Sequence, residues 1–138
     1  MSDRTHEFDV TKSPRIDVRL RSGDVVIRPS DEQTVAVTLR GSTDLVDSAV
    51  VDATHDSVSV RSRTETPKWF SRTMDVLILA PEGSNVRVSL GSGDLVVRVP
   101  LKTIDVNTAS GDVRLDEQVD DIRAVSYTHL TLPTIYSV

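Results

Sequence analysis

The sequence predicts an all-β protein, a β-solenoid-like stack of short two-strand repeats joined by Ser-Gly-Asp turns. Three copies of this triplet, centred on Gly23, Gly93 and Gly111, lie between segments in which apolar and polar residues alternate. Alternation with a period of two is typical of strands that bury one face. Glycine suits a tight strand connection because a Cβ makes positive φ costly. Repetition within one chain indicates that similar units stack on each other.

The three repeats keep aliphatic residues at matching distances from their glycines. Counted at seven, five and three residues before the glycine and two and four after it, these positions hold Ile16, Val18, Leu20, Val25 and Ile27, then Val86, Val88, Leu90, Leu95 and Val97, and finally Ile104, Val106, Thr108, Val113 and Leu115. Only Thr108 is not aliphatic. We therefore expect each repeat to contribute two strands to a single apolar interior.

The rest of the chain supplies further strands. Alternation predicts strands at 6–10, 33–40 and 57–63, and the most apolar strand at 72–80, which we expect to be covered on both faces. Segment 44–56 fits either a bulged strand or a short helical turn, because periodicity does not separate the two; a strand is our prediction. The pattern restarts at 122–124, which is 18 residues after 104, but no further Ser-Gly-Asp follows.

The C-terminal tail departs from this pattern. Residues 125–138 carry no charged side chain, contain both tyrosines and lack the turn triplet, and Val125 to Thr134 resembles a translated transposon-type sequencing adapter. We therefore expect residues 1–124 to form a single, C-terminally truncated domain and residues 125–138 to be a non-native tail. The alternative is a genuine but divergent last pair of strands.

Composition narrows the functional classes. The net charge of −5 and the interleaving of basic with acidic residues disfavour binding to nucleic acid, which depends on concentrated positive charge. There is no cysteine, which excludes disulfides, thiolate metal sites and thiol nucleophiles. The first residues are charged, so we expect no signal peptide, no membrane insertion and, for the sequence as it stands, a cytoplasmic location.

The repeated triplets are interpreted as structural turns. Their glycines and aspartates are Gly23, Asp24, Gly93, Asp94, Gly111 and Asp112. A column of aspartates could instead hold Ca²⁺ or act as paired catalytic carboxylates, but a calcium site needs six or more converging oxygens and one aspartate per turn supplies too few. Gly91-x-Gly93 lacks the third glycine and the helix of a dinucleotide loop. We therefore predict no catalytic, metal or cofactor-binding residue and no cofactor.

The loop between the predicted strands 57–63 and 72–80 holds the candidate contact residues. Trp69 and Phe70 lie beside the basic residues Lys68 and Arg72, and exposed aromatic and arginine side chains are typical of contact surfaces. One interpretation is that this loop binds a carbohydrate or a cell surface. The other is that Trp69 and Phe70 fold back and cap one end of the aliphatic core.

Polar residues at outward positions of the predicted strands suggest a regular surface. The set comprises Arg19, Arg28, Arg87, Arg98 and Arg114 together with Asp17 and Asp105. Because repeat proteins bind through extended faces, we expect a non-enzymatic structural or interaction module whose partner is a protein or another copy of the chain, with a glycan as the alternative. An enzyme that acts on polysaccharides would need carboxylates gathered in a cleft, which the regular spacing does not favour.

Residues Ile16 to Ala124 resemble the DUF4097 family, whose label refers to adhesins. The family's repeat is matched by Leu90-Gly-Ser-Gly-Asp-Leu-Val-Val and by Asn107-Thr-Ala-Ser-Gly-Asp-Val-Arg-Leu, while Met74 to Gly83 is similar to its entry strand and turn. The resemblance implies a β-solenoid-like fold. Its motif is a folding motif, so the resemblance transfers no catalytic residue to this sequence, and the adhesin label is a name rather than a demonstrated activity.

Overall fold

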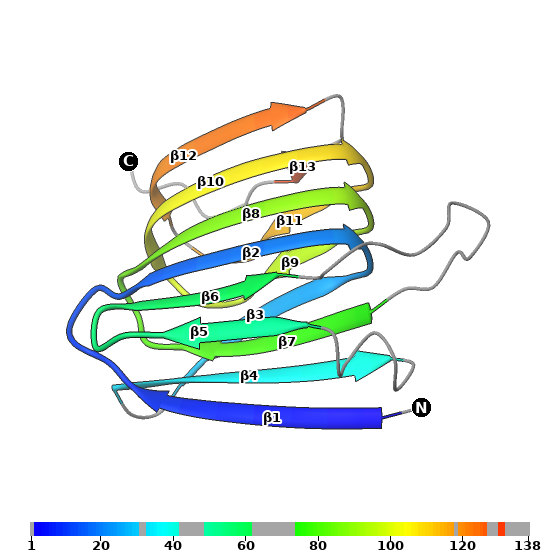
Figure 1. Cartoon of the computed structure of the whole chain (residues 1–138). Coiled ribbons are helices and arrows are strands. Elements are labelled where there is room, and N and C mark those ends of the chain that lie inside the picture. Colours follow the sequence, from blue (N-terminus) through cyan, green and yellow to red (C-terminus); the bar gives the residue numbers. More distant parts are fainter. Residues whose placement is uncertain are drawn as a thin grey trace.

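The computed structural model describes residues 2–30, 33–41, 49–61, 74–117, 119–126 and 130–131. Every regular element within these ranges is a β-strand, and the strands form two sheets that face each other (Figure 1). The prediction of an all-β protein is therefore confirmed.

Sheet A has, among the described residues, seven strands. In spatial order they are β1 (Ser2–Asp9), β4 (Thr34–Gly41), β7 (Met74–Ala80), β3 (Val25–Pro29), β9 (Leu95–Val97), β11 (Val113–Leu115) and β13 (Leu130–Thr131).

Sheet B has six strands within the same ranges. In spatial order they are β12 (Val119–Ser126), β10 (Leu101–Ser110), β8 (Ser84–Ser92), β2 (Arg15–Ser22), β6 (Ser57–Arg61) and β5 (Val50–Ala53).

The repeats of the sequence lie side by side as pairs of strands, one strand in each sheet. In sheet B, β8 pairs in parallel with β10 and with β2, so that Val88 lies opposite both Val106 and Val18. In sheet A, β9 pairs in parallel with β11 and with β3. Figure 1 shows β2, β8, β10 and β12 as one wall of this stack.

The spatial order of the repeats differs from their order in the chain. The β2–β3 repeat lies between the β6–β7 pair and the β8–β9 repeat, although residues 57–80 follow it in the sequence. Consecutive units usually neighbour each other, and sequence periodicity carries no signal for this exchange.

Antiparallel strands occupy one end of both sheets. Strand β4 pairs antiparallel with β7 and with β1, and β5 pairs antiparallel with β6. The sheets are thus mixed, whereas the two-strand repeat alone predicts parallel neighbours. Segment 44–56 contributes β5 at Val50–Ala53, as the strand interpretation required.

The inward side chains of the two sheets form one aliphatic core. Val88, Val97, Val106 and Val113 are each at most 1% exposed, and Thr108, the exception in the repeat pattern, is equally buried. Burial of one such aliphatic side chain contributes roughly 1.5–3 kcal/mol. Valine and isoleucine dominate the core because their branched side chains pack well on a pleated surface.

Strand β7 differs from the expectation that it would be covered on both faces. Its inward residues Val76 and Ile78 are buried, but Leu77 and Leu79 on its other face are only half-buried. The strand therefore contributes aliphatic side chains to the outer face of sheet A.

Candidate functional site

The corner at which the chain passes from sheet B to sheet A is built on a column of close backbone contacts. Gly23, Gly93 and Gly111 have φ angles of 140°, 130° and 128°. A Cβ placed on Gly93 would lie 1.9 Å from the carbonyl oxygen of Gly23, and one on Gly111 would lie 1.8 Å from that of Gly93. A Cβ placed on Gly23 would lie 1.9 Å from the carbonyl oxygen of Met74. Glycine is therefore required at each level by conformation and by space.

The aspartates that follow these glycines form a hydrogen-bonded column. The backbone N–H of Asp94 donates to Oδ1 of Asp24 (3.0 Å), and that of Asp112 donates to Oδ1 of Asp94 (2.9 Å). The N–H of Asp24 donates in turn to Oδ1 of Asp75 (3.2 Å). Each of these three carboxylates accepts a hydrogen bond from a backbone N–H of the next level. These hydrogen bonds therefore join the levels of the stack to one another.

Asp75 belongs to this column although it is not part of a Ser-Gly-Asp triplet. The signal in the sequence is the strand that follows the aspartate, since Asp75-Val-Leu-Ile matches Asp24-Val-Val-Ile in its alternation. Met74 takes the place that a glycine holds at the next level of the column. Because the predicted turn aspartates are those that follow a glycine, Asp75 is not among them.

Replacement of Asp94 by alanine is expected to lower the free energy of unfolding by about 1 kcal/mol, because the N–H of Asp112 loses its acceptor. Asp94→Asn keeps an acceptor oxygen and should lose less. Urea denaturation of both variants measures the difference. Asp52→Ala removes an exposed aspartate from β5 and serves as the control, with an expected change within about 0.5 kcal/mol. Equal losses for Asp94→Ala and Asp52→Ala would contradict the role of the column.

The outer face of sheet B carries a row of charges that alternate in sign from strand to strand. Asp105 of β10 lies opposite Arg87 of β8, which lies opposite Asp17 of β2. Nε of Arg87 is 3.8 Å from Oδ2 of Asp105. We call these three positions the charge row. Opposite charges on neighbouring strands favour this register.

A shallow depression of about 350 Å³ lies beside the charge row. Its polar lining consists of Arg19, Arg87, Ser89, Asp105 and Asn107. Nε of Arg19 is 3.7 Å from Oδ1 of Asp17, and this oxygen is shielded from solvent without a hydrogen bond from the described residues. Both arginine side chains are more than half exposed. The depression therefore presents guanidinium groups held close to carboxylates but beyond hydrogen-bond distance.

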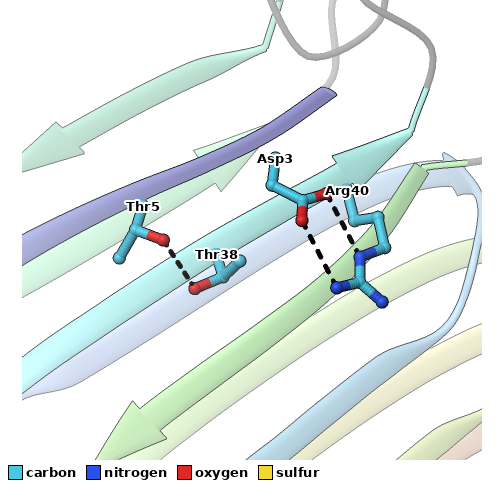
Figure 2. A network of polar contacts seen from close by, with 4 residues as sticks. All are labelled: Asp3, Thr5, Thr38 and Arg40. Carbon is cyan, nitrogen blue, oxygen red and sulfur yellow. Dashed lines mark hydrogen bonds and ion pairs between the residues drawn. The ribbon is translucent and has the colours of Figure 1, made fainter. Parts of the chain in front are cut away.

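The outer face of sheet A has closer polar contacts at its β1–β4 edge. The guanidinium group of Arg40 donates from Nε and Nη2 to the two carboxylate oxygens of Asp3, at 3.2 and 3.3 Å. The hydroxyl groups of Thr5 and Thr38 lie 3.1 Å apart and share a hydrogen bond (Figure 2). These cross-strand pairs fix the register of β1 on β4. The guanidinium group of Arg40 is therefore already bound to Asp3.

One carboxyl group among the described residues has a clearly shifted pKa. A hydrogen bond from the Thr54 hydroxyl, at 2.8 Å, holds the pKa of Asp56 below its usual range, and the neighbouring His55 adds to this effect. The group lies in the exposed turn between β5 and β6, away from the aspartate column and the depression. It therefore stabilises a turn rather than marking a catalytic site.

The loop residues Lys68, Trp69, Phe70 and Arg72 lie outside the described residues. What the structure fixes is the position of the two ends of their segment: β6 ends at Arg61, in register with Arg19, and β7 begins at Met74, next to Gly23. The two described ends thus lie in different sheets, and Met74 lies at the corner where the other levels have a Ser-Gly-Asp turn.

The described ranges hold neither a candidate metal centre nor a membrane-spanning helix. They contain no group of three or more histidine, aspartate or glutamate side chains placed to hold a metal ion. No helix of these residues is long and apolar enough to cross a membrane.

The two facing sheets and the column of corner contacts place the chain in the class of all-β proteins. The chain matches the Toastrack DUF4097 family over residues 14–131 and belongs to it. The match includes β13 and all of β12. Among curated proteins, none matches the sequence.

Solved structures are similar to this chain at low sequence identity, and one with a TM-score above 0.5 shows its fold. A "putative cell adhesion protein" from Clostridium sporogenes ATCC 15579 is 14% identical, with a TM-score of 0.59 over 83% of this chain and 60% of that one. This chain thus spans less than two thirds of that structure. A "putative adhesin" from Bacteroides fragilis NCTC 9343 is 7% identical, with a TM-score of 0.40 over 97% of both chains. A "putative lipid binding protein" from Parabacteroides distasonis ATCC 8503 is 11% identical, with a TM-score of 0.41 over 94% of this chain and 73% of that one.

Proposed function

We propose that this protein is a non-enzymatic interaction module, built as a β-solenoid, that presents the outer face of sheet B to a protein partner. The observation that carries the proposal is the charge row, in which Asp105, Arg87 and Asp17 follow one another on three neighbouring strands. Strands lie about 4.8 Å apart, so charges of one sign recur at roughly twice that distance. A partner with carboxylates and cations at matching spacing would be oriented as well as bound.

The depression supplies groups that a partner can reach. Arg19 and Arg87 approach Asp17 and Asp105 at 3.7 and 3.8 Å, which is longer than a hydrogen bond. Their guanidinium groups can therefore turn to a carboxylate of the partner, for which their planar fork of donors is suited. Ser89 and Asn107 add neutral hydrogen-bonding groups at the same place.

The aspartate column supports the non-enzymatic part of this proposal. Its aspartates lie on successive levels, but Oδ1 of Asp24, Asp75 and Asp94 accepts hydrogen bonds from backbone N–H groups. A catalytic acid or base needs a carboxyl group that is free to exchange a proton with a substrate. The carboxylates of the column instead bind the backbone of the next level and so hold the levels of the stack together.

The proposal is tested with two double variants that change the net charge equally. Arg19→Glu with Arg87→Glu reverses the charge of the depression, whereas Arg28→Glu with Arg98→Glu does the same on sheet A. Proteins from an extract of the source cells are captured on the immobilised full chain and on both variants at low ionic strength. We expect the sheet B variant to lose a captured protein that the sheet A variant keeps. Equal capture by both variants, or none by the unaltered chain, would contradict the proposal.

A second candidate is binding of a carbohydrate or cell surface through Trp69 and Phe70. The observation that favours it is that twelve residues separate Arg61 of sheet B from Met74, which lies at a corner that other levels cross by a tight turn. A long connection is therefore not needed to join the sheets there, and long loops on a rigid scaffold often carry function. The length also suits a segment that folds over the core.

The two interpretations of the aromatic pair predict different results for Trp69→Ala. If the loop binds a glycan, binding on a glycan array is lost while the free energy of unfolding stays within about 0.5 kcal/mol of that of the unaltered chain. If Trp69 caps the core, the variant loses about 3 kcal/mol or more, as truncation of a buried aromatic residue does.

A further inference from the structure

The outer face of sheet A repeats one triplet of outward residues on neighbouring strands. It reads Asp24, Val26 and Arg28 at β3 and, at β9, Asp94, Val96 and Arg98. Because alternate residues of a strand share a face, each triplet runs from an acid through an aliphatic residue to an arginine.

These triplets are in register, so they form three rows across the strands. Val26 lies opposite Val96 on one side and Leu77 of β7 on the other, and all three are half-buried. We call Leu77, Val26 and Val96 the apolar row. On one flank runs the aspartate column of Asp75, Asp24 and Asp94, and on the other runs an arginine row of Arg28 and Arg98.

We propose that a second copy of this chain packs on this face, with a two-fold axis that runs along the apolar row. Rotation by half a turn about such an axis keeps the apolar row in place and exchanges the two flanks. Each Asp24 then faces Arg28 of the second copy, and each Asp94 faces its Arg98. Val26 and Val96 face themselves.

The charge pattern is the reason for choosing a second copy as the occupant. The four charged residues at β3 and β9 are complementary to themselves after this rotation, because each aspartate of one copy meets an arginine of the other, and an unrelated partner would need the same arrangement in reverse. A surface of anionic lipids would be attracted by the arginine row but repelled by the aspartate column. Complementary charges on both flanks suppress other orientations of the two copies.

Polar pairs close the apolar row at both ends. Toward β4, Arg40 is bound by both oxygens of Asp3, and Thr38 is bonded to Thr5 (Figure 2). Toward β11, Asp116 accepts a hydrogen bond from Nε of Arg114 at 2.7 Å and lies 3.6 Å from Nε of Arg98, beyond hydrogen-bond distance. An apolar centre with a polar rim is the arrangement of protein interfaces.

The interface between the two copies would be small, so its formation should be measured over a range of protein concentrations. The apolar row covers three strands spaced about 4.8 Å apart, so the dimer falls in the class of interfaces below about 1,200 Å² of total buried area. Such complexes dissociate readily. We therefore expect a dimer that forms with increasing protein concentration rather than a permanent one.

Cross-linking of introduced thiols tests the axis directly, because the natural sequence contains no cysteine. Val26→Cys and Val96→Cys each place a thiol on the proposed axis, opposite its own copy. Ser89→Cys places one on the outer face of sheet B as a control. With a short bismaleimide reagent, we expect covalent dimers of both sheet A variants and at least tenfold fewer for Ser89→Cys. Equal yields for the three variants would overturn the proposal.

Sedimentation of the full chain supplies the second measurement. The unaltered protein should shift from monomer toward dimer over about a hundredfold range of concentration. The double variant Arg28→Glu with Arg98→Glu should remain monomeric at low salt. Near 1 M salt the Debye length is about 3 Å, so the repulsion between the two copies is screened and association should return. A monomer at every concentration, or an unchanged dimer for this variant, would refute the proposal.

The dimer uses a different face from the proposed partner surface, so the two proposals fail separately. Arg19→Glu with Arg87→Glu should leave the sedimentation behaviour unchanged while it abolishes partner capture. Loss of the dimer with this variant would show that sheet B carries the self-association.

Discussion

Replacement of Gly93 by alanine is expected to destabilise the protein by more than about 4 kcal/mol. Gly93 has φ of 130°, and a Cβ there would lie 1.9 Å from the carbonyl oxygen of Gly23 and 2.7 Å from its carbonyl carbon. Both neighbours are backbone atoms, so the clash is relieved only if two levels of the stack move apart. That movement would break the hydrogen bond from the N–H of Asp94 to Asp24. Urea denaturation followed by far-ultraviolet circular dichroism measures the loss.

Gly83→Ala is the control that separates the steric clash of an added Cβ from the cost of a positive φ angle. Gly83 has φ of 80°, but its nearest neighbour outside the local chain, Oγ of Ser13, lies at 3.9 Å from the added Cβ. We expect only the strain of a left-handed backbone, about 1–2 kcal/mol. Similar losses for Gly83→Ala and Gly93→Ala would show that the column does not depend on close backbone contact.

The second large effect is expected from Val88→Asp, which should abolish cooperative folding. Val88 is fully buried and lies opposite Val18 and Val106 in the centre of sheet B. A carboxylate there loses its hydration and has no partner, and a buried unpaired charge costs several kcal/mol or more. The total stability of a domain of this size is about 5–15 kcal/mol, so much of it would be lost. The sharpness of the thermal transition is the measurement.

Ser89→Asp is the matched control because it places the same side chain one residue further along β8. Ser89 points to the outer face and lines the depression with Arg19 and Arg87, so the added charge stays hydrated and has cations nearby. We expect a change within about 0.5 kcal/mol. Loss of folding in Ser89→Asp together with a tolerated Val88→Asp would reverse the assignment of the two faces.

The all-β fold could be predicted from the sequence because its signal is local. Residues such as Val86, Val88 and Leu90 alternate with polar neighbours, and this alternation determines which side chains can be buried together. The order of the strands could not be predicted. The contact between Val18 and Val88 joins segments 70 residues apart, and any aliphatic strand of the repeat would satisfy the same period. The antiparallel strands β1 and β4 likewise have no signal for their partners.

The candidate surfaces were visible in the sequence only as residue types. Arg87, Asp17 and Asp105 were expected at outward positions, but the alternation of their charges appears only when three strands are brought into register. The same holds for Val26 and Val96, which are ordinary strand residues in the sequence and lie side by side only in the folded sheet. Register depends on contacts between distant segments, and a single sequence does not contain that information directly.

Methyl nuclear Overhauser effects among Val18, Val88 and Val106 test the stacked interior most directly. In protein labelled at the valine methyl groups, we predict cross-peaks between Val18 and Val88 and between Val88 and Val106, with little broadening by a soluble paramagnetic agent. This follows from their opposed positions on three parallel strands and their exposure of 1% or less. Absence of these cross-peaks, with the three methyl groups broadened as strongly as those of exposed residues, would contradict it.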